Sequence, residues 1–380
     1  MMLAVKPENN FSNSPDQIAT LLRNKIVAGE FKRGDKLPTT RQLTKDVKVS
    51  NITITKALNS LKNEGLIRVG PRGTFVEFGT DVSERTKISN SSREIAVCLS
   101  SISIYHYARI FEGVESSNAD TKKNRGLQIY NTNGQLAKQA DTIMRILDKK
   151  SSGLILVPCV SETTPPYQIR ILQSASIPVV FCLRGVEGIK APLVGWDWEQ
   201  VGKIVATEFL NLGHRKIAYI AGLKYSMSET YERAMNEVLK SANCPEMSVY
   251  YGHNVDNYED GAMHDKAKEE MFNKLLSNPQ RPTAIFCNDG TSESLIYLTA
   301  QKYGLKIPQD LSVICFEHTR RDCVIAKKFT TIGADHFSIG EMSLSIVDEM
   351  IEGKRSIDDD EKVLLPITLS DNKTLTKAPA

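Results

Sequence analysis

The chain has 380 residues, of which 41% are hydrophobic and 24% are charged, and its net charge is +3. This length exceeds one average domain, so two or three domains are expected, and the hydrophobic share is ordinary for a protein with a buried core. No apolar run approaches the ~18 residues that span a bilayer. The N-terminus turns polar too soon for a secretory signal. We therefore expect a cytoplasmic protein without a membrane-spanning helix.

Charge is distributed unevenly along the chain. Residues 1–78 hold 13 Lys/Arg and 7 Asp/Glu, whereas the remaining residues hold 35 and 38. Basic charge concentrated in a small N-terminal region is typical of a protein that binds a polyanion. A solvated basic surface without a partner would give the same count, so charge alone leaves both interpretations open.

The seven cysteines form no Cys-x-x-Cys pair, and their number is odd. Four of them stand in apolar runs that predict strands, where a thiol behaves as a small hydrophobe: Cys98, Cys182, Cys287 and Cys315. This usage indicates a reducing compartment rather than a disulfide framework. We expect no metal site and no cofactor.

The first predicted helix begins after Ser14, an N-cap residue. Pro15 suits the first helical position, and Gln17 completes a capping box. Apolar residues then repeat at helical spacing, which predicts one buried stripe: Ile18, Leu21, Leu22 and Ile26.

A second short helix is predicted after Pro38, with Thr39 or Thr40 as its cap. A third begins after Ser50 and ends at Gly65. Two strand-like pieces, 67–69 and 74–78, then flank a Gly-Pro-Arg-Gly turn, which predicts a hairpin with a basic tip. Three helices followed by a hairpin predict a winged helix-turn-helix.

The third predicted helix presents polar and cationic residues opposite its apolar stripe: Asn51, Thr55, Lys56, Asn59 and Lys62. Such side chains reach base edges and phosphates, so we interpret this face as a candidate DNA-reading surface. Arg72 in the hairpin tip is a candidate phosphate contact. The alternative is a purely structural three-helix unit.

Residues 14–78 resemble the winged-helix domain of the GntR family of transcription regulators. The matching pieces are Gly34-Asp35-Lys36-Leu37-Pro38, Arg41-Gln42-Leu43, Val49-Ser50, Thr53-Ile54, Ala57-Leu58, Gly65-Leu66-Ile67 and Arg72-Gly73-Thr74-Phe75-Val76. The resemblance implies that Arg41, Ser50, Thr53 and Gly73 contact DNA. The family usually has arginines where this chain has Asn51 and Thr55. Because asparagine pairs well with adenine, we expect an operator richer in A·T.

Residues 79–93 are polar and serine-rich, with no apolar periodicity, and predict a linker. The sequence therefore predicts three segments. Residues 1–78 form the winged helix-turn-helix, residues 79–93 the linker, and residues 94–370 an effector-binding and dimerisation domain.

After Glu94, short β-branched runs alternate with helical segments, which predicts parallel sheets with helices on both faces. Strands are expected at 95–99, 127–130, 154–157, 179–183, 217–220, 284–287 and 313–316. Helices are expected at 106–123, 135–149, 167–175, 198–212, 228–242, 257–277, 291–303 and 336–352. The length favours two α/β lobes, so the fold class is an α+β winged helix followed by a two-lobed α/β domain.

Ligands of open α/β sheets bind beyond the carboxyl ends of the strands. The candidate residues there are His106, Tyr107, Arg184, Trp196, Asp197, Trp198, Asn288 and Asp289. Aromatic faces beside polar tips suit a polyhydroxylated ligand. Alternatively, Asp197 and Asp289 are helix N-caps, and the aromatic residues are core or interface packing.

Residues 94–370 resemble the effector domain of the LacI family, whose fold is that of periplasmic sugar-binding proteins. The matching pieces run from Leu212 to Gly222, from Ala284 to Asp289, from Pro308 to Phe316 and from Phe329 to Ile332. A GntR reader joined to such a sensor is the arrangement of the arabinose-repressor type. By resemblance, the domain closes two lobes on a ligand and dimerises through them.

The same resemblance implies an effector site. His106 and Tyr107 match the family's ring-contacting pair, and Asp289 matches its hydroxyl-binding carboxylate. Tyr231 takes the place of the arginine that grips the ligand, unless a shifted register brings Arg233 there. Asn254 stands where the family has an aromatic residue.

These observations predict a repressor that a small sugar-like effector releases from a palindromic operator, acting as a homodimer with half-sites about a helical turn apart. One alternative is a cytoplasmic solute-binding or dimerisation protein without ligand-gated DNA release. A second is an enzyme. Because no nucleotide-binding, metalloprotease or nucleophile motif is present, we expect no catalytic activity.

Overall fold

The computed structural model of the chain describes residues 14–79, 94–102, 104–120, 125–159, 163–253, 261–288, 292–316, 329–370 and 373–379. The chain divides into two compact units. The first unit comprises residues 1–101, 115–193 and 342–361, and the second comprises residues 102–114, 194–341 and 362–380. The N-terminal winged helix is part of the first unit.

The winged helix consists of α1 (Pro15–Val27), α2 (Thr40–Val47), α3 (Asn51–Asn63), β1 (Ile67–Gly70) and β2 (Gly73–Val76). Ser14 and Thr39 each close a reciprocal capping box, with Gln17 and Gln42 respectively. β1 and β2 pair in antiparallel register. The predicted three helices and hairpin are therefore confirmed, with Thr39 rather than Thr40 as the cap of α2.

The end of α3 shows how local sequence sets an element boundary. Glu64 is the C-cap residue, and Gly65 follows it with φ +73°, a left-handed conformation that favours glycine. The amide of Leu66 then bonds back to the carbonyl of Leu61 at 3.0 Å. This cap turns the chain out of the helix and into β1.

A six-stranded sheet of the order β13-β7-β6-β5-β3-β4 follows the winged helix. Its strands are β3 (Glu94–Leu99), β4 (Gly126–Asn131), β5 (Gly153–Leu156), β6 (Val179–Cys182), β7 (Leu193–Gly195) and β13 (Lys362–Leu364). The pairs β3–β4, β3–β5 and β5–β6 are parallel. In the first unit, α5 (Leu136–Lys149) and α6 (Pro166–Ser174) join the core cluster that contains alternate residues of β3, β5 and β6.

The second sheet has the order β14-β12-β11-β10-β8-β9. Its strands are β8 (Ile217–Leu223), β9 (Ser248–His253), β10 (Ala284–Asn288), β11 (Ser312–Phe316), β12 (Thr330–Gly333) and β14 (Thr368–Leu369). The strand pairs are parallel except for β12–β14. The helices of this unit include α7 (Trp198–Asn211), α8 (Ser226–Ser241), α9 (Gly261–Ser277) and α10 (Glu293–Lys302).

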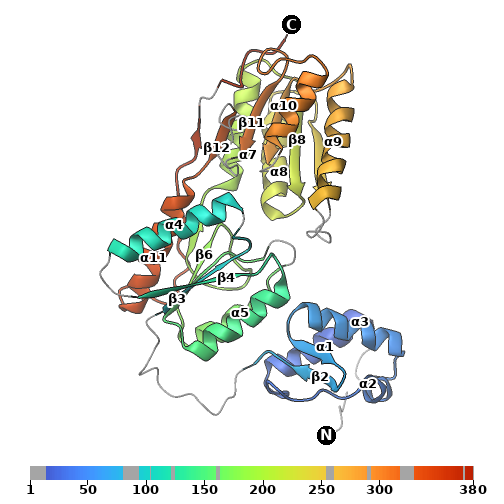
Figure 1. The fold of residues 1–380 in the computed structure, drawn as a ribbon, viewed down its shortest axis with the longest axis vertical. Coiled ribbons are helices and arrows are strands. Elements are labelled where there is room, and N and C mark those ends of the chain that lie inside the picture. Colours follow the sequence, from blue (N-terminus) through green and yellow to red (C-terminus); the bar gives the residue numbers. More distant parts are fainter. Residues whose placement is uncertain are drawn as a thin grey trace. The chain divides into compact units, whose positions relative to one another are not determined.

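Alternate residues of the second sheet face different helices. Ile285 and Val313 pack with the buried residues of α9 and α10, two helices that lie on the same side of the sheet (Figure 1). Phe286 and Phe316 instead contact the ring of Tyr231 on α8. The period-two alternation of a strand therefore determines which residues line the α8 face.

The predicted α/β alternation is confirmed, because every strand and helix expected after residue 94 has a counterpart. Five further strands were not predicted: β7, β9, β12, β13 and β14. Four of them have only two to four residues, and β9 ends in Gly-His, so none gives a clear periodic signal. Two helices, α4 (Tyr105–Asp120) and α11 (His336–Ile351), run from one unit into the other.

Six cysteines fall in the described chain, and within it no two of them form a disulfide. The four expected in strands are buried there, at Cys98, Cys182, Cys287 and Cys315. Among the described residues, no helix has both the length and the apolar composition that crossing a membrane requires.

Candidate functional sites

The candidate DNA-reading residues of α3 lie at its start and along its solvent side. Ser50, Asn51, Thr55 and Lys56 are exposed, and Thr53 is half-buried. Ser50 Oγ caps the helix by accepting the amide of Thr53 at 3.1 Å. The Oδ1 atom of Asn51 accepts the hydroxyl of Thr44 at 2.8 Å, so its amide group retains donors that can reach a base or a phosphate.

The hairpin supplies the remaining candidates. Arg72 is exposed in the turn between β1 and β2, and Arg41 is exposed in the first turn of α2. Gly73 has φ +128°, and a Cβ added there would lie 2.5 Å from Cε of Lys36. The glycine therefore gives the Lys36 side chain room beside the wing, where its Nζ lies 5.9 Å from the centre of the Phe75 ring. None of the predicted DNA-contacting residues is buried.

The second unit contains a connected group of rings, which we call the aromatic cluster: His106, Tyr107, Trp196, Tyr231, Phe316 and His336. His106 lies 3.9 Å from Tyr107 and 5.4 Å from His336, measured between ring centroids. Trp196 lies 5.4 Å from His336 and 5.3 Å from Phe316. Every member is buried. The structure therefore brings three predicted effector residues, His106, Tyr107 and Tyr231, into one cluster.

Tyr231 stands where the resemblance expects an arginine, and it is fully buried. The indole N–H of Trp196 donates to its hydroxyl oxygen at 3.0 Å. Burial raises the pKa of Tyr231 well above its usual value, although the bond from Trp196 opposes this shift. This position therefore contributes a neutral hydrogen-bonding ring rather than a cation.

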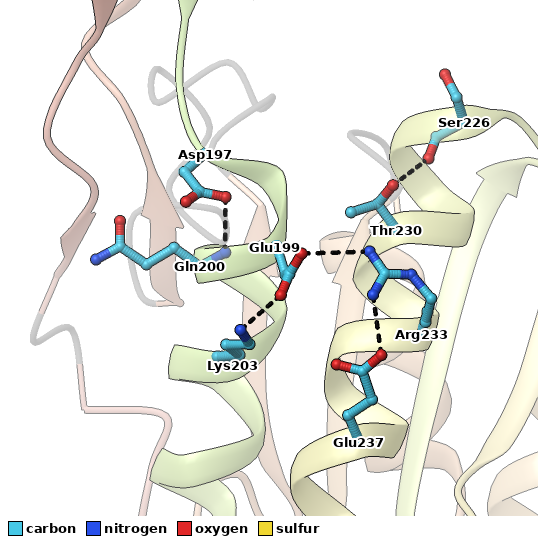
Figure 2. A network of polar contacts seen from close by, with 8 residues as sticks. All are labelled: Asp197, Glu199, Gln200, Lys203, Ser226, Thr230, Arg233 and Glu237. Carbon is cyan, nitrogen blue, oxygen red and sulfur yellow. Dashed lines mark hydrogen bonds and ion pairs between the residues drawn. The ribbon is translucent and has the colours of Figure 1, made fainter.

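Arg233, the alternative to Tyr231, points toward carboxylates on the surface of the second unit. It bonds to Glu237 at 2.9 Å and to Glu199 at 3.4 Å, and Glu199 also binds Lys203. Figure 2 shows this network between α7 and α8. The helices approach closely here, since a Cβ on Gly202 would lie 2.8 Å from the carbonyl oxygen of Tyr231. Arg233 is thus engaged in an exposed ion-pair network and is not a member of the aromatic cluster.

His336 is a candidate that the sequence analysis missed. It is the first residue of α11 and comes three residues after β12 ends at Gly333, and it is 5% exposed. Its Nε2 atom has no hydrogen-bond partner among the described residues. Burial lowers the pKa of His336 to about 4, with Asp335 opposing the shift and Arg109 adding to it. The polar tip Asp335-His336 after the Thr330–Gly333 strand was the available signal, but that strand was not predicted.

The remaining candidates are placed less closely together. Arg184 belongs to the first unit, where it donates to the carbonyl of Pro158 at 2.7 Å and to the hydroxyl of Ser100 at 3.1 Å. Asp197 caps α7 by accepting the amide of Gln200 at 3.1 Å, so the N-cap alternative describes its contact. Asn254 and Asp289 lie outside the described residues.

No group of three or more His, Cys, Asp or Glu side chains that could hold a metal ion occurs within the described ranges. The aromatic cluster presents ring faces together with polar ring atoms, among them the Tyr231 hydroxyl and His336 Nε2. What the winged helix offers is exposed amides, hydroxyls and cations. The first set suits an uncharged, partly polar small molecule, and the second suits a polyanion.

Two family models match separate parts of the chain. Residues 15–76 match the model for bacterial regulatory proteins of the gntR family. Residues 206–374 match the model for a periplasmic binding protein-like domain. The chain is also 25% identical over 341 residues to the arabinose metabolism transcriptional repressor of Geobacillus stearothermophilus, covering 88% of this chain and 89% of that protein.

A second relative is the catabolite control protein A of Priestia megaterium, which is 24% identical over 83% of this chain and 93% of its own. Two solved structures share the fold. A LacI family transcriptional regulator from Enterococcus faecium with bound ribose has a TM-score of 0.62 at 17% identity, covering 75% of this chain and all of that one. The lac repressor dimer bound to operator has a TM-score of 0.61 at 18% identity, covering 76% and 96%.

The fold and the matches define a two-part chain in which a helix-turn-helix domain precedes a sensor-like α/β domain. Specifically, it carries a gntR-type helix-turn-helix domain and a periplasmic-binding-protein-like domain, and its homologues are LacI-type transcriptional repressors.

Proposed function

We propose that the chain is a cytoplasmic transcriptional repressor and that a small, sugar-like effector controls its binding to the operator. The observation that carries this proposal is the exposed polar face of α3 beside a basic wing, in a chain that continues into two parallel α/β sheets. The repressor homologues support it, and they do not favour a solute-binding protein without DNA release. Because those homologues are regulators, we propose no catalytic activity.

In this proposal the winged helix, residues 1–78, reads DNA. Asn51 and Thr55 face the groove from α3, and Lys56 on the same helix contacts a phosphate, while Ser50 and Thr53 form the N-terminal edge of the helix. Arg41, Arg72 and Gly73 contact the backbone from α2 and the wing. Their exposure and the basic excess of residues 1–78 support this assignment.

The effector contacts the aromatic cluster of the second unit. His106, Tyr107 and Tyr231 present ring faces and polar ring atoms. His336 joins them, because its buried Nε2 has no hydrogen-bond partner in the described part of the chain and can bond to a ligand hydroxyl. Arg184, Asn254 and Asp289 stay candidate effector residues on the sequence alone. We assign this role to the segment 94–370, which the linker 79–93 joins to the reader.

We further propose that the protein is a homodimer and that its operator is palindromic. Two readers related by a two-fold axis require two half-sites related in the same way. One of the similar structures is a dimer on its operator, which supports this arrangement.

The direct test selects duplexes from a random library with the full chain at low salt and sequences the bound fraction. The expected result is one enriched inverted repeat, richer in A·T than a guanine-contacting relative would choose. An absence of enrichment, together with unchanged binding after Lys56→Gln and Arg72→Gln, would contradict the DNA-reading role. Lys240→Gln on α8 is the matched surface control.

A thermal-shift screen of the full chain against monosaccharides, sugar acids and short oligosaccharides tests the effector role. A ligand at a hundredfold excess over its Kd stabilises the folded protein by about 2.7 kcal/mol. We expect one compound to raise the melting temperature of the native chain but not that of His106→Ala, and to weaken binding to the selected duplex. If the compound instead strengthens binding of the chain to the duplex, the effector promotes DNA binding and the predicted release is wrong.

A further inference from the structure

The first unit contains a polar path that links a candidate effector residue to the end of the DNA-reading helix. It begins at Arg184, whose Nε donates to the carbonyl of Pro158. The next amide, that of Cys159, donates to Oε1 of Gln139 on α5 at 2.9 Å. Gln139 Nε2 then donates to Oε1 of Gln168 on α6, also at 2.9 Å.

The path ends on α3. Gln168 Nε2 donates to the backbone carbonyl oxygen of Glu64 at 3.3 Å, and Glu64 is the C-cap residue of that helix. Gln139 and Gln168 are both fully buried. A buried amide that lost one of these bonds would have no water to replace it, so each link is costly to break.

Shape and charge reinforce this contact between the winged helix and the helices of the first unit. A Cβ added to Gly65 would lie 2.6 Å from Cβ of Ala140, so only glycine allows α3 to end this close to α5. The Phe78 ring meets the Tyr167 ring edge-on, with 5.2 Å between centroids. Arg33 also pairs with Asp148 of α5 at 2.8 Å.

The Glu64 carboxylate accepts hydrogen bonds both from the winged helix and from α6 of the first unit. It accepts Nε of Arg23 from α1 at 2.7 Å and the hydroxyl of Tyr167 from α6 at 3.3 Å. Burial raises the pKa of Tyr167, and the neighbouring Glu64 charge adds to that shift, so Tyr167 remains a hydrogen-bond donor. The reading residues Asn51, Thr55 and Lys56 stay exposed, so the contact holds the winged helix without covering its DNA-reading face.

We propose that this contact is a latch that holds the winged helix in one orientation on the first unit, and that the Gln139–Gln168 relay makes the latch sensitive to the contacts of Arg184. The inference rests on the proposed function, because a ligand that re-directs Arg184 would act on the reader through this relay. The winged helix has two states in this proposal. In one, the latch contacts hold it on the first unit, and in the other, only the covalent connection through residues 80–93 joins it to that unit.

The test measures the latched population without needing the effector. Spin labels at Asn24→Cys on α1 and Lys138→Cys on α5, both exposed positions, report the distance between winged helix and first unit by double electron–electron resonance. Cys244 and Cys323 are replaced by serine. The full chain should give one narrow distance distribution, whereas a broad one would overturn the latch.

Two substitutions separate the latch from the relay. Gln168→Met keeps the side-chain length but removes both bonds, and it should lower the ratio of latched to released protein about tenfold. Arg184→Met should also broaden the distance distribution, although Arg184 lies at the far end of the path from α3. Arg170→Met is the control, since this exposed α6 arginine bonds only to the carbonyl of Gly188 among the described residues.

The outcomes are distinguishable. If Arg184→Met leaves the distribution narrow while Gln168→Met broadens it, the relay is wrong. If Gln168→Met unfolds the chain, as circular dichroism would show, Tyr167→Phe takes its place, because it removes the hydroxyl that donates to Glu64 and leaves the Gln139–Gln168 bond in place. Binding of a mixed-sequence duplex at low salt should be unchanged in Gln168→Met. If the native chain itself does not bind the duplex, the result would instead contradict the proposed function.

Discussion

Trp196 donates its indole N–H to the hydroxyl of Tyr231 at 3.0 Å, and both side chains are buried in the second unit. Trp196 follows β7, whereas Tyr231 lies on α8, so the bond joins segments that are 35 residues apart. It places a neutral, paired ring where the family resemblance expects a cation. The pair therefore shapes the proposed effector site and also stabilises the unit that contains it.

Tyr231→Phe removes the acceptor and leaves a buried indole N–H without a partner. We expect the free energy of unfolding to fall by about 1–3 kcal/mol, measured by urea denaturation followed through tryptophan fluorescence. Trp196→Phe should give a similar loss, and the double variant should lose less than the sum. Tyr250→Phe, at a half-buried position of β9, is the control. Additive losses would show that the two groups do not interact.

His336 should make the stability of the protein depend on pH. Its pKa in the folded state is about 4, below the ordinary value of 6.5, so the unfolded chain binds the proton more readily. Stability is therefore retained above pH 6.5 and lost as the pH falls from 6.5 toward 4. Between pH 7 and pH 5 this one residue accounts for about 2 kcal/mol.

His336→Phe removes this contribution while keeping a ring in the cluster. Urea midpoints at pH 7 and pH 5 should lie closer together for the variant than for the native chain. Burial also lowers the pKa of His214, with the Thr376 carbonyl opposing the shift, so some acid sensitivity remains. Equal pH dependence in the two proteins would show that His336 is not buried as a neutral ring.

Two glycines allow α4 and α11 to cross closely in the second unit. A Cβ on Gly340 would lie 2.0 Å from the carbonyl oxygen of Ile110, and one on Gly113 equally close to that of Phe337. The added Cβ would clash with backbone atoms, which cannot move aside as the end of a flexible side chain can. Gly340→Ala should therefore destabilise the protein by about 3 kcal/mol or more. Thermal melting measures the loss.

Gly185→Ala is the matched control for the crossing, since its Cβ would lie 3.9 Å from the Phe181 ring. It should melt within a few degrees of the native chain. If Gly340→Ala melts equally high, the helices do not approach as closely as the structure places them.

The basic residues of the winged helix should determine the salt dependence of DNA binding. Each phosphate contact lowers the slope of log K against log salt by about 1. Lys56→Gln and Arg72→Gln should therefore each flatten the slope by about 1, whereas the exposed Lys240→Gln should leave it unchanged. Fluorescence anisotropy with a labelled duplex over a salt series gives the slopes. A flattening by Lys240→Gln would point to DNA contacts outside the winged helix.

The residue pattern determined the order and type of the main elements, because the signals concerned are local. Ser14 and Thr39 close their caps within three residues, and Gly65 ends α3 through its own backbone conformation. The alternation of strands and helices is likewise a local signal, because apolar residues that face the same side of one element recur at short spacings in the sequence. Short strands such as β7 and β13 carry too few residues for such a signal.

Only the tertiary structure decided which side chains meet. Tyr231 and Arg233 are two residues apart on α8, but the helix turns one toward the aromatic cluster and the other toward Glu199 and Glu237. Gln168 reaches the carbonyl of Glu64 across 104 residues of sequence. No periodicity specifies such a contact, because it depends on how separate elements pack. The sequence by itself thus determined a winged helix-turn-helix followed by an α/β domain, whereas packing determined the aromatic cluster and the contact between Gln168 and Glu64.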